Sequence, residues 1–252
     1  MYMRLMRLKA LSGKSQEFCE FYQNEVLREL RRSGGCVFAT LTEGLTNPDE
    51  FVSLTLWNDL EDLKRYQESE RYRELLEQTQ PFLAESGEWR VKLSDDLTLD
   101  YSPQKETPKV TQYRLAAGME SEELSHLQAP THLLIRRFSV AADKIAEISR
   151  GYAEEVSPII GNVTGCLYAG LLMNLEAEHQ LASVTIWANR EDAERYERSE
   201  LFMEIMQKAR EIVGAQNWDL MLDPKSAGSP GGNKTLPAQA YHVVAGQSLS
   251  ES

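Results

Sequence analysis

Apolar positions along the first hundred residues follow two spacings, one typical of strands and one typical of helices. Residues 2–11 are apolar and extended, which predicts a first strand. Residues 13–31 have helical spacing and place these side chains on one face: Phe18, Tyr22, Val26 and Leu30. The segments CVFATLTEG and EFVSLTLW then predict two strands, joined by a turn around Asn47-Pro48-Asp49.

A second helix is predicted for DLEDLKRYQESERYRELLEQTQPFL, which begins at Asp59. The Asp59 side chain is an N-cap that accepts hydrogen bonds from amides of the first turn. Ser69 is typical of the cap of a second helical segment, so we expect a bend there. The segment EWRVKL predicts a fourth strand. The order β-α-β-β-α-β is the ferredoxin-like pattern, an antiparallel sheet with both helices on one face.

The same elements occur twice along the chain. The segment SLTLWNDLEDLKRYQESERYRELL begins at Ser53, and SVTIWANREDAERYERSELFMEIM begins at Ser183. An offset of 130 residues matches these pairs without a gap: Trp57 with Trp187, Tyr66 with Tyr196, Tyr22 with Tyr152, and Arg7 with Arg137. One offset over so long a stretch indicates a duplication.

Each repeat ends in a short apolar segment behind a polar connector. QYRLAAG at 112–118 matches AYHVVAG at 240–246, and the connectors have the Pro, Ser, Lys and Gly content of flexible linkers. We predict the following organisation: unit 1 at 1–96, a linker at 97–130 with a detached strand at 110–118, unit 2 at 131–223, and a flexible tail at 224–252 with a terminal strand at 239–246. Each detached strand could pair with its own unit, with the other unit or with another chain.

The fold class predicted from these elements is α+β. The first and second strands are too apolar on both faces to leave one face of the sheet exposed. We therefore expect two tandem ferredoxin-like units that pack sheet to sheet within one chain.

Composition narrows the classes of partner. The net charge of −12 disfavours nucleic acid and anionic membranes, which both require clustered Lys and Arg. The three cysteines, Cys19, Cys36 and Cys166, form no CxxC pair, and the four histidines show no metal-ligand spacing. No apolar run is long enough to span a membrane. We expect a cytoplasmic protein that uses no metal and no other cofactor.

The most closely repeated residues resemble a known family. A Trp closes the third strand at Trp57 and Trp187, and Glu-Asp, Arg-Tyr and Ser-Glu pairs follow along the second helix. This pattern resembles the antibiotic biosynthesis monooxygenase (ABM) domains of the dimeric α+β barrel superfamily, over about residues 1–96 and 131–223. Members usually pair two chains into a barrel. The resemblance therefore implies an intramolecular dimeric α+β barrel, a pseudo-dimer in one chain.

The family's chemistry is varied. Some relatives oxidise polycyclic phenols to quinones with O2 and without metal or flavin, and others open haem, isomerise or decarboxylate small molecules, or sense stress. The resemblance places the Asn, Trp and His of the haem-degrading branch at these positions: Met6, Tyr66 and near Leu76 in unit 1, and Arg136, Tyr196 and near Met206 in unit 2. None of the three residue types is retained, so we expect no haem degradation.

The resemblance also implies a ligand cavity in each unit, between the helices and the unit's own sheet. The candidates to line these cavities are Tyr22, Tyr152, Tyr66, Tyr196, Trp57, Trp187, Trp89, Trp218, Arg7 and Arg137. A Tyr hydroxyl there could donate a proton to an intermediate, or the ring could belong to the core. Trp57 and Trp187 favour packing of the helix onto the sheet, whereas Trp89 and Trp218 could line a pocket mouth or the contact between units. An inward Arg on the first strand could hold an anionic substrate, and an outward Arg would protect a strand edge.

Three functions remain open. The first is a cofactor-independent monooxygenase for a small aromatic or phenolic molecule. The second is a non-catalytic small-molecule-binding or stress-associated protein. The third is an assembly role, in which the detached strands add to a sheet edge of a second copy and form a homodimer. Cys36 and Cys166 are interpreted as small buried residues, because no His accompanies either thiol.

Overall fold

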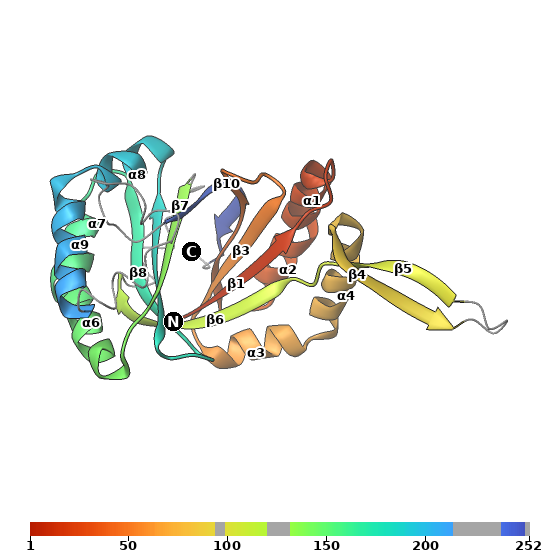
Figure 1. The fold of residues 1–252 in the computed structure, drawn as a ribbon, viewed down its shortest axis with the longest axis horizontal. Coiled ribbons are helices and arrows are strands. Elements are labelled where there is room, and N and C mark those ends of the chain that lie inside the picture. The colour runs from red at the N-terminus through yellow and green to blue at the C-terminus, as the bar shows by residue number, and fades with distance from the viewer. Residues whose placement is uncertain (94–98, 120–131, 214–237, 250–252) are drawn as a thin grey trace.

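A barrel of β-strands lies at the centre of the molecule, and the helices of the two units cover opposite sides of it (Figure 1). The computed structural model of the chain describes residues 1–93, 99–119, 132–213 and 238–249. Within these ranges, eight strands close into one barrel in the order β1-β3-β2-β10-β7-β9-β8-β6. The predicted α+β class and the intramolecular barrel are therefore confirmed.

Within the described residues, the first repeat supplies six helical segments and six strands. Its elements are β1 (Tyr2–Lys9), α1 (Ser15–Phe21), the π-helical turn η1 (Tyr22–Val26), α2 (Leu27–Arg32), β2 (Cys36–Gly44), β3 (Glu50–Trp57), α3 (Leu60–Glu68), α4 (Glu70–Thr79), the 3₁₀ turn η2 (Gln80–Phe82), β4 (Glu85–Leu93), β5 (Leu99–Lys105) and β6 (Lys109–Gly118).

The second repeat follows the same plan. Its elements are β7 (His132–Ser139), the 3₁₀ turn η3 (Ala142–Lys144), α6 (Ile145–Gly151), the π-helical turn η4 (Tyr152–Val156), α7 (Ser157–Gly161), β8 (Cys166–Asn174), β9 (Gln180–Trp187), α8 (Arg190–Glu197), α9 (Glu200–Val213) and β10 (Gln239–Ser248). Because both repeats contain a π-helical turn at the same place, the duplication extends to this local detail of the backbone.

The two detached strands are integral strands of the barrel. β6 pairs with β1 of unit 1 on one side and with β8 of unit 2 on the other. β10 pairs in the same way with β7 and with β2. Each strand therefore pairs with its own unit and with the other unit. Since both edges of each strand are used within the chain, the structure does not support their docking on a second copy.

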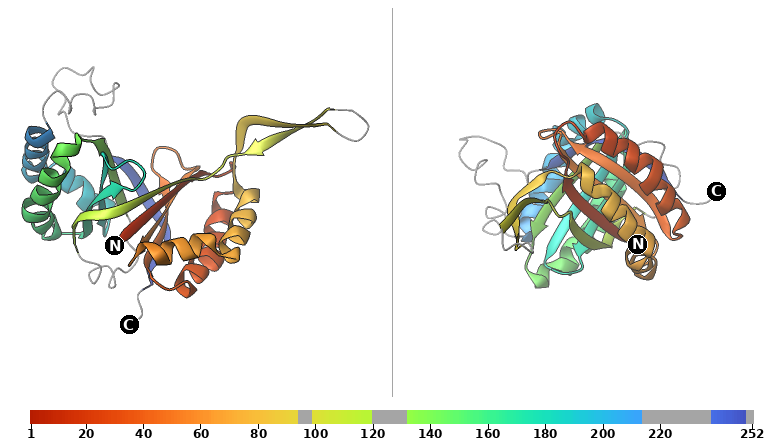
Figure 2. Two further views of the ribbon diagram at one scale, coloured as in Figure 1. Left: turned by 90° about the horizontal axis from the view of Figure 1, so that it is seen from below. Right: turned by 90° about the vertical axis from the view of Figure 1, so that its right-hand side faces the viewer.

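The predicted place of the fourth strand, EWRVKL, was wrong. This segment forms β4, which pairs with β5 in a two-stranded ribbon that projects away from the barrel (Figure 2). The position beside β1 belongs to β6 instead. Because β6 pairs with β1 on one side and with β8 on the other, neither of these two strands is left with an open edge.

Three apolar layers follow from the alternation of side chains along the strands. The barrel interior contains residues from both units, among them Leu5, Phe38, Ile135 and Tyr168. Other strand residues face outward and pack beneath the helices of their own unit. The chain thus has one core shared by both units and a separate layer between each sheet and its helices.

The predicted helix caps are confirmed. The Asp59 side chain accepts a hydrogen bond from the Asp62 amide, and Asn189 accepts one from Asp192, both at 2.8 Å. Ser69 has extended backbone angles and caps α4, so the second helix of unit 1 bends there as expected. In the described part of the chain, no helix is long and apolar enough to cross a membrane.

We expect His132, a buried residue of β7, to make the stability of the fold depend on pH. It is only 3% exposed, and burial, followed by the nearby Arg190, lowers its pKa from the ordinary 6.5. Glu194 raises this pKa and His242 lowers it. Below about pH 6.5, His132 therefore takes up a proton more readily in the unfolded chain than in the folded chain. We expect stability to fall as the pH drops from 7.5 to 5, and urea titration of wild type and His132→Gln will measure this. An equally steep loss in the variant would show that His132 is not responsible.

Candidate functional site

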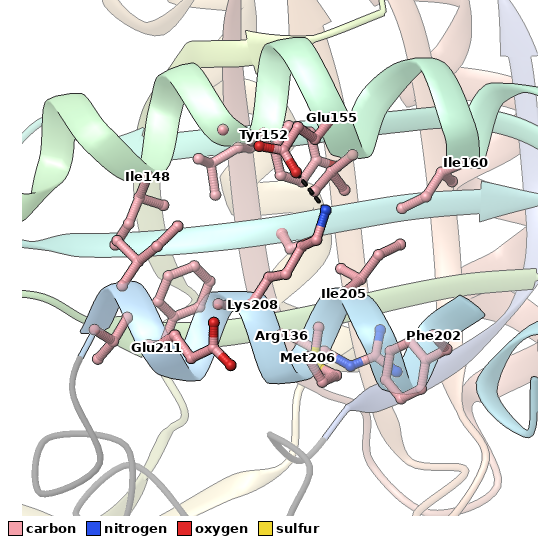
Figure 3. Close-up of a pocket in the computed structure, with 18 of the residues that line it drawn as sticks. Arg136, Ile148, Tyr152, Glu155, Ile160, Phe202, Ile205, Met206, Lys208 and Glu211 are labelled. Carbon is pink, nitrogen blue, oxygen red and sulfur yellow. Dashed lines mark hydrogen bonds and ion pairs between the residues drawn. The ribbon is translucent and has the colours of Figure 1, made fainter. Parts of the chain in front are cut away.

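A cavity of about 660 Å³ lies between the helices of unit 2 and the outer face of its sheet. Helices α6 and α7, with η4, form one wall, and α9 forms the opposite wall. Strands β7, β8 and β9 form the floor, through Arg136, Leu171 and Ser183 among others. Figure 3 shows apolar side chains from the two walls pointing toward one another across this space, including Ile148 and Ile205. Its size suits a small organic ligand.

The corresponding space in unit 1 is almost filled. It measures about 40 Å³, although it is bounded by the equivalent elements. Phe18 packs against Phe51 and Phe82 with ring centroids 5.3 and 5.9 Å apart, and Phe21 packs against Phe82 at 5.3 Å. We call these four residues the aromatic plug. The two units therefore share a fold and differ in their internal space.

Residue size explains this difference. At the offset of 130, the residues of unit 2 that correspond to Phe18, Phe21, Phe51 and Phe82 are Ile148, Gly151, Leu181 and Ile212. The replacement of Phe21 by Gly151 removes a whole side chain. A Cβ built on Gly151 would lie 3.7 Å from Ile212, the counterpart of Phe82, so this position faces the same neighbour in both units. Protein interiors are close-packed, and ring volume that is not replaced remains as a cavity.

Arg136 is the buried charge in the floor of this cavity. Its side chain is 5% exposed, its guanidinium lies 4.8 Å from the centroid of the Phe202 ring, and it forms an ion pair with Glu197. Burial lowers the pKa of Arg136, and Glu197 raises it. Its Nε atom has no hydrogen-bond partner among the described residues. An unpartnered buried donor is costly, so this atom can contribute to binding a ligand acceptor.

Unit 1 also has a buried arginine, whose Nε likewise has no hydrogen-bond partner among the described residues. Arg4 lies two positions before the counterpart of Arg136, and its guanidinium is 5.2 Å from the centroid of the Tyr72 ring. It also donates a hydrogen bond to the Tyr72 hydroxyl. Phe202 occupies the equivalent position in unit 2 and has no hydroxyl to offer. The ring is thus kept in both units, whereas the polar partner of the guanidinium is the Tyr72 hydroxyl in unit 1 and the Glu197 carboxylate in unit 2. Only in unit 2 does the buried arginine face a large cavity.

Two tyrosines face the unit 2 cavity. In unit 1 the Tyr22 hydroxyl lies 2.8 Å from Ser53 Oγ. The Tyr152 hydroxyl faces Ser183, the counterpart of Ser53, but makes no hydrogen bond of ordinary length within the described ranges. Burial raises the pKa of Tyr152 and of Tyr196, with Arg136 opposing the shift at Tyr196. Both phenols are therefore protonated at neutral pH and can donate a hydrogen bond.

Charged side chains lie around the opening of the cavity. Lys208 of α9 and Glu155 of η4 form an ion pair at 2.5 Å that connects the two walls (Figure 3). Their side chains are 60% and 54% exposed, so water screens the pair and it contributes little stability. The opening is therefore polar, while the interior is apolar apart from Arg136, the tyrosines and the small hydroxyl groups of the floor.

The other candidates lie elsewhere. Trp57 and Trp187 are fully buried and donate from Nε1 to Thr55 and Thr185, so they fix the helices on the sheets. Trp89 belongs to β4, and Trp218 lies outside the described residues. Tyr22 and Tyr66 border only the small space in unit 1. Arg7 and Arg137 border neither cavity; both reach Gln239 of β10 instead.

The cysteine thiols are poor nucleophiles. Burial raises the pKa of Cys19 to about 11, with smaller contributions from Glu43 and Glu20, and burial also raises that of Cys36. Both thiols are protonated at neutral pH and lack the thiolate needed for attack. Among the described residues, no group of three His, Cys, Asp or Glu side chains is arranged to hold a metal ion.

Comparison with known proteins agrees with the duplicated architecture. The antibiotic biosynthesis monooxygenase family matches residues 1–78 and again residues 131–208, which together are more than half of the chain. The chain belongs to the antibiotic biosynthesis monooxygenase family. Among proteins of curated function, the comparison finds no match.

Solved structures share the fold of this ABM protein at low identity. A candidate monooxygenase from Fusobacterium nucleatum has a TM-score of 0.64 and 6% identity, and the match covers 98% of this chain and 94% of the other. A candidate monooxygenase from Lactobacillus acidophilus has a TM-score of 0.62 and 7% identity, with 98% and 96% covered. An anthrone oxidase-like protein has a TM-score of 0.52 and 14% identity, with 99% and 94% covered. At these identities the likeness establishes the fold alone.

Sequence reasoning missed the most informative residues of this ABM protein. Arg136 entered only as the place of a missing Asn, yet it supplies the cavity's buried charge. Gly151 is not among the predicted site residues, although it lines the cavity and carries no side chain to fill it. A signal was present, because Met6 pairs with Arg136 and Phe21 pairs with Gly151 at the offset of 130. The positions at which the two repeats differ therefore indicate the cavity better than the positions at which they match.

Proposed function

We propose that unit 2 binds a small aromatic molecule with an acidic phenol, and that the protein oxidises it as a cofactor-independent monooxygenase. One observation carries this proposal: an apolar cavity of about 660 Å³ holds a buried arginine whose Nε is unpartnered in the described structure. The apolar walls suit fused aromatic rings, and the guanidinium suits a phenolate oxygen. Membership of the ABM family and the fold shared with an anthrone oxidase-like protein support the same chemistry.

The residues present suit a reaction in which the substrate supplies the electrons. A methylene between two phenolic rings loses a proton to water, and the resulting anion is stabilised by Arg136. The anion passes its electrons to O2, a C–O bond forms, and the hydroperoxide eliminates water to leave a carbonyl. One O2 is consumed and one water is released for each CH2 converted to C=O. Tyr152 and Tyr196, both protonated, can donate to the developing peroxide.

Oxygen uptake with anthrone-type and hydroquinone substrates tests this proposal. We expect one O2 consumed per quinone formed, and a rate about 100-fold lower in Tyr196→Phe, because a positioned proton donor contributes about that factor. Tyr66→Phe is the matched control, since Tyr66 occupies the same place beside the filled space of unit 1. Equal rate losses in the two variants would contradict the assignment to unit 2.

A second function is favoured by the protonation states in the cavity. The tyrosines are neutral, and Glu197 is already paired with Arg136. Carboxylates such as Glu154 line the cavity at its exposed edge. Such a site can bind a phenol without turning it over, as in a small-molecule-binding protein. If the protein binds these phenolic molecules but consumes no oxygen with any of them, the second function is favoured over the first.

A further inference from the structure

We propose a second binding site, for a small oxyanion, where Arg7 and Arg137 meet beside the barrel. Neither arginine borders a helix-side cavity. They occupy the same position in the first strand of each unit, β1 and β7. Although these strands belong to different units, both side chains reach one residue, Gln239 of β10. The ligand would be a phosphate or a carboxylate held between the two units.

Three donors converge on a single oxygen in this arrangement. Gln239 Oε1 accepts from Arg7 Nη2 at 2.7 Å, from Arg137 Nη1, and from the Tyr241 hydroxyl at 3.3 Å. An amide oxygen has two lone pairs and no net charge. Two guanidinium groups and a phenol therefore share an acceptor that cannot fully satisfy them. A phosphate or carboxylate offers more lone pairs and a negative charge to the same donors.

The charges around the arginines support an anion. Neither Arg7 nor Arg137 forms an ion pair with a carboxylate among the described residues, although the chain carries a net charge of −12. Two like charges that meet without an anion repel each other. Lys109 lies directly beside Arg7 in the register of β6 and β1, and it adds a further positive charge. Burial raises the pKa of Tyr241, the positive charge of Arg7 lowers it, and Glu50 raises it to a smaller extent.

The side chains that meet at this position are accessible to solvent. Arg7 and Arg137 are half-buried, and Gln239 is exposed, so solvent reaches the arginines. Arg137 Nε also donates to the buried Tyr113 hydroxyl at 3.4 Å, which ties its guanidinium to β6. The planar guanidinium groups favour bidentate contacts with carboxylate or phosphate oxygens. Gln239 can turn outward and yield its place to the anion, because its side chain is exposed.

Thermal unfolding with inorganic phosphate, at ionic strength held constant with sodium chloride, tests this site. We expect phosphate to raise the Tm of wild type, of Gln239→Ala and of the surface control Arg28→Gln. Arg7→Gln and Arg137→Gln should each weaken phosphate binding about tenfold, through loss of a charge-assisted hydrogen bond. Gln239→Glu should raise the Tm without phosphate and abolish the response to it, because its own carboxylate occupies the site. Succinate in a parallel titration distinguishes a carboxylate ligand from a phosphate ligand.

Two results would overturn the proposal. The first is a wild-type Tm that neither phosphate nor succinate raises above the sodium chloride reference. The second is an undiminished response in Arg7→Gln and Arg137→Gln. These outcomes are independent of oxygen uptake in unit 2, because neither arginine lines the cavity there.

Discussion

Gly151→Phe should close the unit 2 cavity and abolish binding of phenolic ligands. The new ring points toward Ile212, as Phe21 points toward Phe82 in unit 1, and it occupies the space between α6 and α9. Gly151 has helical backbone angles, φ −58 and ψ −38, so a side chain is tolerated there. Calorimetric titration with a hydroxyanthraquinone measures the loss of binding.

Gly151→Ala is the matched control for this change. Its Cβ fits at 3.7 Å from Ile212 and leaves the cavity open. Replacing a helical Gly by Ala should also add about 1 kcal/mol of stability. We therefore expect Gly151→Ala to bind the ligand like wild type and to unfold at a higher temperature. Wild-type affinity in Gly151→Phe would contradict the placement of the site.

Arg136→Met should weaken binding of phenolate ligands about 10- to 100-fold. A hydrogen bond to a charged group contributes about 1.5–3 kcal/mol, which corresponds to roughly this factor. Met is the residue that unit 1 carries at this position, Met6, so the change fits the fold. Glu197 loses its partner, but its side chain is 30% exposed and can be hydrated. Affinity is measured above and below the pKa of the ligand's phenol.

The neutral form of the ligand is the internal control for this variant. Arg136→Met should bind the protonated phenol about as well as wild type does, because the apolar walls are unchanged. Arg190→Met, which removes an arginine that is 63% exposed on α8, should affect neither form. An equal loss for both forms would show that Arg136 supports the cavity's shape and not the ligand's charge.

The sequence predicted the local elements well and the long-range pairings less well. Caps at Asp59 and Ser69 depend on neighbouring residues, so the chain alone reveals them. The position of EWRVKL depends on which strand pairs with the free edge of β1. In the structure this strand is β6, and it also pairs with β8 of the other unit, which local sequence does not reveal. The alternation of apolar and polar residues could not predict which way the Arg7 side chain points, because apolar residues occupy both faces of its strand.

The cavity could not be predicted for a different reason. Phe21 and Gly151 were visible as a mismatch between the repeats, but cavity volume depends on how the neighbouring side chains fill the space. In unit 1, Phe18 and Phe82 meet and close it. In unit 2, Ile148 and Ile212 line the cavity without filling it. One substitution alone does not reveal this result, since four positions change together.

The binding stoichiometry of a hydroxyanthraquinone tests the central claim most directly. The aromatic plug fills unit 1 and leaves unit 2 open, so calorimetric titration should give one site per chain. This site should be lost in Gly151→Phe and retained in Phe21→Ala. Two equivalent sites per chain, or a single site that survives Gly151→Phe, would contradict the account.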